Sequence, residues 1–441
     1  MKAKWLNVLF IAVPLTGAAW YLNRQGPYAG QLTLVIFGVA LLAVIPLASV
    51  FGRLTDTLGK YLGDRLGGLL SASFGNVPEL AIGVALLIHA HVHMTQALTV
   101  ESDLKVIRGL LLGSVINNLL FVLGSAVLLA ALRNGRMTFS AEGAGGYASM
   151  LALAVVGLAL PTIAVSLAGV SGEELQVSAV SVSVPFGIIL ILSYIAYIAA
   201  TEFHLGMRPK RGAARGEAGE ADEGGDAEEA AARPAITTDG AVVLADAPAP
   251  ETARERAAAQ AESANADAIA REKLRELRRQ NPYAVPVALA GLAAASVATV
   301  LIAVVLVSVT DNVIVNTNLT SLSVGLVLFP IVCNLGEQAG AITNAWRNRM
   351  EGTMAVAAGS SVQVALFVTP VLALVSVPLA AGNLALMLPI IFPALELVVL
   401  GLVCFVYALV SLDGETTWLE GLQLLAFYAM VVAVAFVLPG R

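Results

Sequence analysis

Long apolar segments separated by short polar breaks recur along almost the whole chain. They lie near residues 4–22, 30–52, 69–92, 108–132, 147–168, 177–203, 283–309, 320–346, 352–378, 384–411 and 417–438. A helix of about 20 apolar residues crosses the hydrocarbon core of a bilayer. The segments lack the alternation of barrel strands, and a helix pairs its own backbone groups inside lipid. The pattern therefore predicts an all-α polytopic membrane protein of about 11 transmembrane helices.

The composition agrees with a chain that lies mostly in a lipid bilayer. Of its 441 residues, 58% are hydrophobic and 13% are charged, whereas about 25% are charged in a soluble domain. Cys333 and Cys404 both lie in apolar segments, which argues against a disulfide framework and a Cys-based metal site. The net charge of −6 argues against nucleic acid as a partner.

The first apolar segment has two interpretations. Lys2 and Lys4 precede it, as in a cleaved signal peptide. Its apolar stretch is long for a signal peptide, and Trp20 near its end suits an interfacial anchor. We therefore expect a leading transmembrane helix and loop in residues 1–29.

A long polar segment, residues 208–282, interrupts the apolar pattern. It carries 12 of the 25 basic and 15 of the 31 acidic residues. Its Ala-, Gly-, Pro- and Glu-rich middle cannot bury a core, which predicts a partly disordered linker with an acidic cluster from Glu217 to Glu229. The stretch from Ala253 to Arg279 has a helical pattern, as a solvated helix leading into the membrane or as a regulatory element.

Lysine and arginine in the short loops predict the orientation. Most of them fall on the side that carries the linker, and such loops stay in the cytoplasm. They are Lys2, Lys4, Arg53, Lys60, Arg65, Arg133, Arg136, Arg347 and Arg349, whereas the loop at Lys105 and Arg108 is an exception. We expect a multi-pass protein of the cell inner membrane with a cytoplasmic N-terminus and an external C-terminus.

The two halves of the chain carry a common signature. Asn76 and Glu79 in the third segment match Asn334 and Glu337 in the eighth as Asn-x-x-Glu. In the next segment of each half, Gly-Ser is followed at one spacing by Leu-Phe-Val. After the leading helix, residues 30–207 and 283–441 hold five segments each. Because an odd number inverts the second copy, the sequence predicts two inverted five-helix repeats, as in many secondary transporters.

The repeated polar residues predict a cation site within the membrane. A carboxylate at mid-membrane costs about 2.5–3.5 kcal/mol on insertion scales, so Glu79 and Glu337 should face the protein interior. Pro78, Gly75 and Gly336 would let the backbone unwind locally beside them. The predicted ligands are Glu79, Glu337, Asn76 and Asn334, with Ser114, Asn117, Asn118, Ser360, Ser361 and Gln363 nearby.

An all-oxygen site of this kind favours a hard cation. Calcium takes about six to eight oxygens, and two carboxylates match its charge. Magnesium holds its waters more tightly, while zinc and copper favour His or Cys. Protons compete for the same carboxylates, and the chain lacks the phosphate loop of ATP-driven proteins. We therefore expect transported calcium and protons, an ion gradient as the energy source, and no cofactor.

These motifs resemble those of the calcium/proton exchanger family of the calcium/cation antiporter superfamily. Gly75, Asn76, Glu79 and Leu80 match the family's Gly-Asn-x-x-Glu-Leu. The following segments match at Gly113, Ser114, Asn118, Leu119 and Leu120, and at Gly359, Ser360, Ser361 and Gln363. The resemblance covers most of both halves but not the linker. It implies export of calcium in exchange for protons by alternating access, with one leading helix and two inverted groups of five.

The second motif departs from the family pattern. The family usually has Gly-Asn-x-Ala-Glu-His, whereas this chain reads Cys333, Asn334, Leu335, Gly336, Glu337 and Gln338. Because Gln338 cannot exchange a proton as His can, the resemblance implies cation binding more firmly than coupling to protons.

Other titratable residues have open interpretations. Glu396 in the tenth segment serves either proton passage or a buried hydrogen bond. Glu101 and Asp103 are expected in an outer loop, as solvated charges or as groups that attract cations. His89 and His93 share one helical face and could bind zinc, but we expect no carboxylate or cysteine beside them.

Three alternatives to calcium/proton exchange follow from the same sequence. The nearest keeps the architecture and exchanges sodium, potassium or manganese for protons, or sodium for calcium. An intramembrane transferase would need an Asp-rich motif or a Ser/His pair within the membrane, and the sequence has neither. A passive channel fits less well because paired buried carboxylates bind too tightly for fast conduction. We therefore expect a transporter and not an enzyme.

Overall fold

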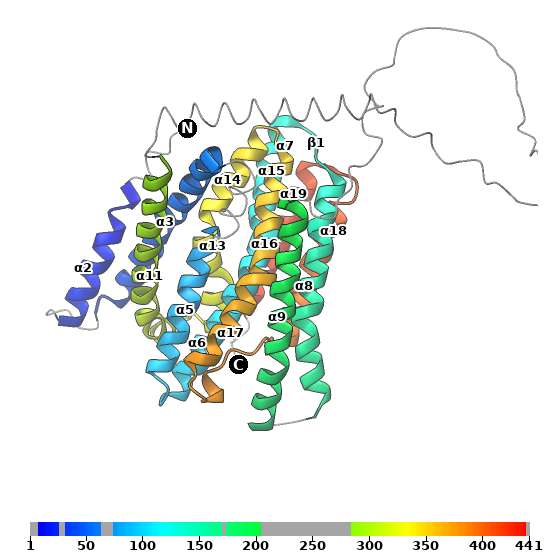
Figure 1. Ribbon diagram of the computed structural model, residues 1–441. Coiled ribbons are helices and arrows are strands. Elements are labelled where there is room, and N and C mark those ends of the chain that lie inside the picture. The colour runs from blue at the N-terminus through cyan, green and yellow to red at the C-terminus, as the bar shows by residue number, and fades with distance from the viewer. Residues whose placement is uncertain (1–7, 26–30, 63–73, 170–172, 204–283, 438–441) are drawn as a thin grey trace, which may run out of the picture. The chain divides into compact units, whose positions relative to one another are not determined.

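The structure is a computed structural model that describes residues 8–25, 31–62, 74–169, 173–203 and 284–437. These residues form one almost wholly helical unit (Figure 1). The predicted linker 208–282, with its acidic cluster and helical stretch, lies outside the described residues.

The described elements follow the predicted segments in order. The first half contains α2 (Ala12–Gln25), α3 (Thr33–Leu62), α5 (Val77–Val92), α6 (Ala97–Ile116), η1 (Asn117–Val122), α7 (Leu123–Asn134), β1 (Met137–Thr138), α8 (Ala141–Leu167) and α9 (Glu173–Phe203). The second half contains α11 (Ala284–Asn316), α12 (Ser321–Ser323), η3 (Val324–Leu328), α13 (Phe329–Cys333), α14 (Leu335–Trp346), α15 (Met350–Met354), η4 (Ala355–Gly359), α16 (Ser360–Gln363), η5 (Val364–Val368), α17 (Thr369–Leu379), η6 (Leu384–Leu386), α18 (Ala394–Val410), β2 (Glu415–Thr416) and α19 (Trp418–Val437). The short strands β1 and β2 pair antiparallel.

The fold class is confirmed as an all-α polytopic membrane protein. Among the described residues, 7 helices are long and apolar enough to cross a membrane, and a bent pair raises the number to 8. In that pair, Ser321–Cys333 meets Leu335–Trp346 at 53°. The apolar helices α5 and α18 are shorter than this criterion requires. The count of 11 crossings stays a prediction.

Helix α6 begins earlier than the sequence pattern predicted. Its first residue is Ala97, whereas the apolar segment starts near residue 108. The intervening charges are paired with protein partners: Glu101 forms an i,i+4 ion pair with Lys105, and Asp103 is only 1% exposed. The expected solvated outer loop is therefore wrong for Asp103.

The tenth predicted segment is also shorter as a helix. It was expected to begin near residue 384, but α18 begins at Ala394. Pro389 and Pro393 lie in the irregular stretch before it, and proline removes a backbone donor from a helix. Glu396 therefore lies in the first turn of α18 rather than in the interior of a long helix.

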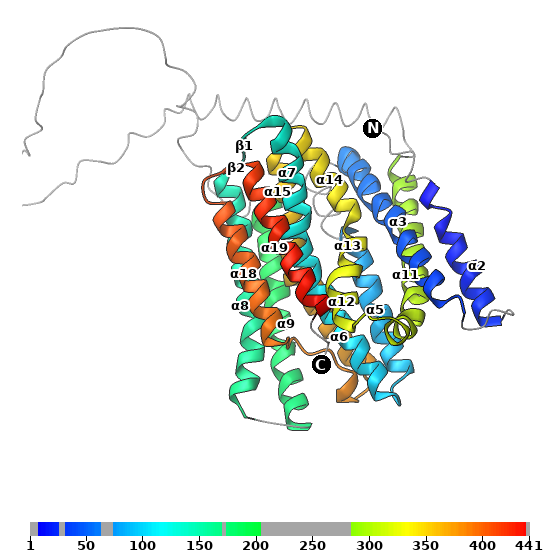
Figure 2. The same ribbon diagram turned by 180° about the vertical axis from the view of Figure 1, so that it is seen from behind.

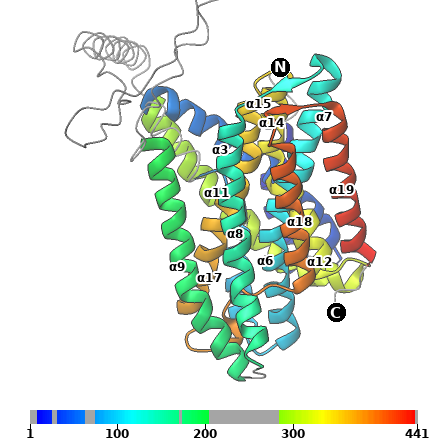
Figure 3. The same cartoon turned by 90° about the vertical axis from the view of Figure 1, so that its right-hand side faces the viewer.

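The central helices pack closely against one another, both within and between the two halves of the chain. Helix α11 packs beside α3 and α5, and α7 packs beside α19 (Figures 1 and 2). Helix α8 packs against both α9 and α18 (Figure 3). At the contact of α6 with η3, Gly109 and Gly325 allow backbones to touch, since a Cβ on Gly109 would lie 2.9 Å from the Leu326 nitrogen.

Candidate cation-binding site

The two Asn-x-x-Glu motifs each lie at the start of a helix. Asn76 is the N-cap of α5 and Glu79 lies in its first turn. Asn334 is the N-cap of α14, at the bend after α13, and Glu337 lies in the first turn. The predicted local breaks beside the glutamates are thus present. Carboxylates near a helix N-terminus are favoured by the helix dipole.

Glu337 is held by two neutral hydrogen-bond donors. Its Oε1 accepts from the Ser360 hydroxyl at 3.0 Å, and its Oε2 accepts from Asn118 Nδ2 at 3.3 Å. Asn118 Nδ2 also donates to Ser360 Oγ at 3.0 Å. Ser360 Oγ lies 3.2 Å from Asn76 Oδ1 as well, and its single proton serves one acceptor at a time. The network therefore joins predicted site residues from both halves of the chain.

Glu79 has a different environment from Glu337. Its side chain is 1% exposed, and neither carboxylate oxygen has a hydrogen-bond partner in the part of the chain that the structure describes. The carboxylate is near enough to Glu337 to interact with it electrostatically. A buried carboxylate without partners is costly. A cation or a proton at this position would relieve that cost.

Several other predicted site residues carry buried polar atoms without a partner among the described residues. They are Asn76 Nδ2, Ser114 Oγ, Asn117 Oδ1, Asn118 Oδ1, and both amide atoms of Asn334. Native interiors leave few such atoms unpaired. The oxygen atoms of this set could serve as ligands for a hard cation, together with the two of Glu79. They are Ser114 Oγ, Asn117 Oδ1, Asn118 Oδ1 and Asn334 Oδ1.

The hydrogen-bond network around Glu337 also excludes two further predicted residues, Ser361 and Gln363. Ser361 Oγ donates to the Ala357 carbonyl at 2.8 Å and lies 3.4 Å from the Val115 carbonyl, so it bonds to helix backbone. Gln363 is 6% exposed and has no side-chain hydrogen bond to any residue described. The sequence could not separate Ser360 from Ser361, because both follow Gly359 within one helical turn.

Two of the three positions where the second motif departs from the family, Cys333 and Gln338, have different roles. Cys333 is 3% exposed and belongs to the apolar core, as expected for a small packed residue. Gln338 Nε2 lies 3.4 Å from Ser125 Oγ on α7, to which it donates a long hydrogen bond. The side chain that replaces the family's His therefore contacts a hydroxyl group, and no charged group of the described residues pairs with it.

Glu396 has a neighbour that the sequence did not indicate. Its Oε2 is buried without a hydrogen-bond partner among the described residues, and so is Arg108 Nε. The two side chains interact electrostatically between α18 and α6. Arg108 was expected in an external loop, but it lies within α6 because that helix begins at Ala97.

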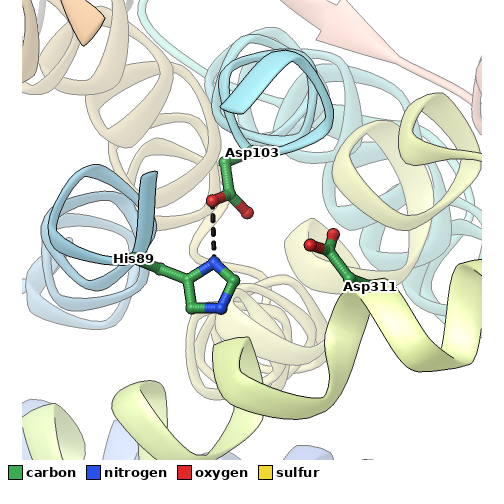
Figure 4. A group of neighbouring side chains, drawn as sticks. All are labelled: His89, Asp103 and Asp311. Carbon is green, nitrogen blue, oxygen red and sulfur yellow. Dashed lines mark hydrogen bonds and ion pairs between the residues drawn. The ribbon is translucent and has the colours of Figure 1, made fainter. Parts of the chain in front are cut away.

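The expectation that no carboxylate lies beside His89 is wrong. His89 Nδ1 is 2.8 Å from Asp103 Oδ2, and Asp311 of α11 lies close to both (Figure 4). His93 Nδ1 hydrogen-bonds to the His89 carbonyl oxygen at 2.9 Å. No local pattern in the sequence indicates this group, since its members come from three separate helices.

Known proteins of similar sequence match this chain over most of its length. The Ca(2+)/H(+) antiporter of Aphanothece halophytica is 30% identical over 409 residues, covering 91% of this chain and 89% of the relative. The Ca(2+)/H(+) antiporter of Synechocystis sp. is also 30% identical, covering 99% and 97%. The vacuolar calcium ion transporter of Schizosaccharomyces pombe is 29% identical, covering 100% and 86%.

Solved structures support the fold. The structure of native YfkE matches with a TM-score of 0.67 at 23% identity, covering 98% of this chain and 100% of that one. The H+/Ca2+ exchanger CAX matches with a TM-score of 0.63 at 13% identity, covering 99% and 88%. The profile of the family described as sodium/calcium exchanger protein matches residues 32–201 and 287–437. The chain therefore belongs to the sodium/calcium exchanger protein family.

Proposed function

We propose that this protein is a secondary active transporter that exports calcium from the cytoplasm in exchange for protons. The observation that carries the proposal is the pair of buried carboxylates, Glu79 and Glu337, at the starts of α5 and α14. Relatives that are 30% identical and cover about nine-tenths or more of the chain are named Ca(2+)/H(+) antiporters. That name agrees with a site rich in oxygen atoms.

The two glutamates have different roles at the proposed site. Glu337 is oriented by Asn118 and Ser360, so it provides a fixed anchor for the cation. Glu79 has no partner among the described residues, so its carboxylate is free to change ligand. Calcium takes about six to eight oxygen ligands, which Asn334, Ser114 and the further predicted residues would complete. When calcium leaves, protons replace it on the same carboxylates.

Alternating access would come from two repeats of opposite orientation. We place the first five-helix repeat in residues 30–207 and the second in residues 283–441, after a leading region of residues 1–29. An inverted pair supplies equivalent halves that move against one another around a fixed site. The loop charges favour a cytoplasmic N-terminus and linker and an external C-terminus in the cell inner membrane.

The test measures flux in sealed inverted membrane vesicles that carry a proton gradient. Added calcium should dissipate the gradient and accumulate inside, and Glu79→Gln or Glu337→Gln should abolish both effects. Glu351→Gln, at an exposed residue of α15, is the matched control and should transport normally. If sodium or potassium dissipates the gradient and calcium does not, the proposed substrate is wrong. Normal transport by either glutamine variant would remove that residue from the mechanism.

A further inference from the structure

A second group of polar side chains lies far along α5 from Glu79. His89 of α5, Asp103 of α6 and Asp311 of α11 each offer a ligand atom, and these atoms all lie within 4.8 Å of one another (Figure 4). Glu79 and His89 are ten positions apart on α5. At about 1.5 Å per residue, the two positions are roughly 15 Å apart along the helix. The group is therefore distinct from the proposed transport site.

The carboxylate of Asp103 lies in an unusual environment. It is 1% exposed within a membrane-spanning helix, and its Oδ2 contacts His89 Nδ1 at 2.8 Å. The other carboxylate oxygen has no hydrogen bond within the described ranges. Since burial of an incompletely paired carboxylate is costly, the side chain retains capacity for a positively charged ligand.

Asp311 adds a second acid to the same place. It is half-buried and makes no hydrogen bond or ion pair with any residue that the structure describes. In Figure 4 its carboxylate points toward Asp103 and His89. Two carboxylates this close repel each other unless a cation or a proton lies between them. Lys105, two positions after Asp103 on α6, is paired with Glu101.

We propose that His89, Asp103 and Asp311 bind a divalent transition metal ion of the zinc class. An imidazole nitrogen with carboxylate oxygens is a ligand set that zinc accepts, with water in the fourth position. Two carboxylates neutralise the charge of such an ion. At metal–ligand distances near 2.0–2.2 Å, tetrahedral ligand atoms lie about 3.4 Å apart, so small side-chain rotations close the site. Calcium fits less well, because it prefers oxygen ligands throughout.

His93 is a neighbour of this site and not one of its ligands. Its ring lies 4.2 Å from the His89 ring, centroid to centroid. Its Nδ1 is held by the His89 carbonyl oxygen. We infer that His93 supports the orientation of His89, and the test below separates its contribution from that of the two aspartates.

The test measures zinc binding to the tag-free, full-length protein. A Glu79→Gln/Glu337→Gln background removes the carboxylates of the proposed transport site, and the readout is isothermal titration after chelator treatment. We expect one zinc ion per chain. Asp311→Asn should weaken binding at least about tenfold, as losses of metal-site groups commonly do. Glu101→Gln is the matched control, because Glu101 lies near Asp103 on α6 but its side chain is 61% exposed, and it should leave affinity unchanged.

Independent spectroscopy tests the ligand set without depending on a variant. X-ray absorption at the zinc edge should show one imidazole and otherwise oxygen ligands. Absence of zinc binding in the background protein would overturn the proposal. So would affinity that survives Asp311→Asn but is lost in His91→Ala/His93→Ala, because this would identify an adventitious site made by those two histidines. A spectrum with two or more imidazoles would lead to the same conclusion.

Discussion

Asn118 Nδ2 donates a hydrogen bond to Glu337 Oε2 at 3.3 Å, although the two residues are 219 positions apart in the sequence. Asn118 belongs to the motif segment of the first half, and Glu337 belongs to the repeated motif of the second. The carboxylate of one half is thus oriented by an amide of the other. Movement of the halves against each other would change this contact, which links the geometry of the site to alternating access.

Asn118→Ala should weaken calcium binding. A hydrogen bond to a charged group contributes about 1.5–3 kcal/mol, so loss of this donor predicts an affinity about 10- to 100-fold lower. The measurement is the calcium concentration for half-maximal uptake into inverted vesicles. Asn312→Ala is the control, because Asn312 is exposed on α11. An unchanged affinity in Asn118→Ala would show that Glu337 does not need this donor.

Ser360 and Ser361 should differ sharply when each is changed to alanine. The Ser360 hydroxyl contacts Glu337 and Asn76, whereas Ser361 donates to a helix carbonyl. Ser360→Ala should therefore lower calcium affinity about tenfold, on the scale of one hydrogen bond to a charged group. Ser361→Ala should change affinity less than about threefold. Equal losses in the same uptake assay would contradict the distinction that the hydrogen bonds make.

The principal residues of the proposed site could be named from the sequence because they repeat. Asn76 with Glu79 and Asn334 with Glu337 are matching polar pairs in strongly apolar surroundings. A carboxylate buried in the membrane is costly, so two of them at matching positions indicate a common function. The structure places both pairs at helix starts, and Asn118 and Ser360 connect two of the four residues, Asn76 and Glu337.

Other features could not be predicted, because a hydropathy pattern shows where charged residues lie in the sequence but not which residues they contact in the fold. Asp103 resembles a loop residue in sequence, yet it is buried against His89. Its neighbour Asp311 comes from α11, more than 200 positions away in the sequence. Ser360 and Ser361 are adjacent in the sequence, yet the Ser360 hydroxyl contacts Glu337 whereas the Ser361 hydroxyl donates to a helix carbonyl. Contacts between distant segments are set by packing, which a local pattern does not encode.

Gln338→His should alter the dependence of transport on pH. Histidine titrates near pH 6.5 in the absence of perturbation. A protonated imidazole one position after Glu337 would oppose calcium binding, so uptake should fall more steeply between about pH 8 and 6 than in the parent protein. Ser125→Ala removes the hydroxyl contact of Gln338 without adding a titratable group, and its pH profile should match that of the parent. Parallel profiles for all three proteins would exclude an effect of residue 338 on proton coupling.

Gly325→Ala should destabilise the contact between the two halves. A Cβ at this position would lie 2.5 Å from the Val106 carbonyl oxygen and 3.0 Å from the Val106 Cα. Both atoms are backbone, so the clash requires α6 and η3 to separate. Overpacking of this kind costs about 1–3 kcal/mol, which predicts a Tm lower by several degrees in detergent. Gly38→Ala is the matched control, because its Cβ would meet nothing within 4 Å. Alanine favours a helix over glycine by roughly 1 kcal/mol, so this control should melt at the parent temperature or above it. If Gly325→Ala melts with the control, the two backbones can move apart at little cost.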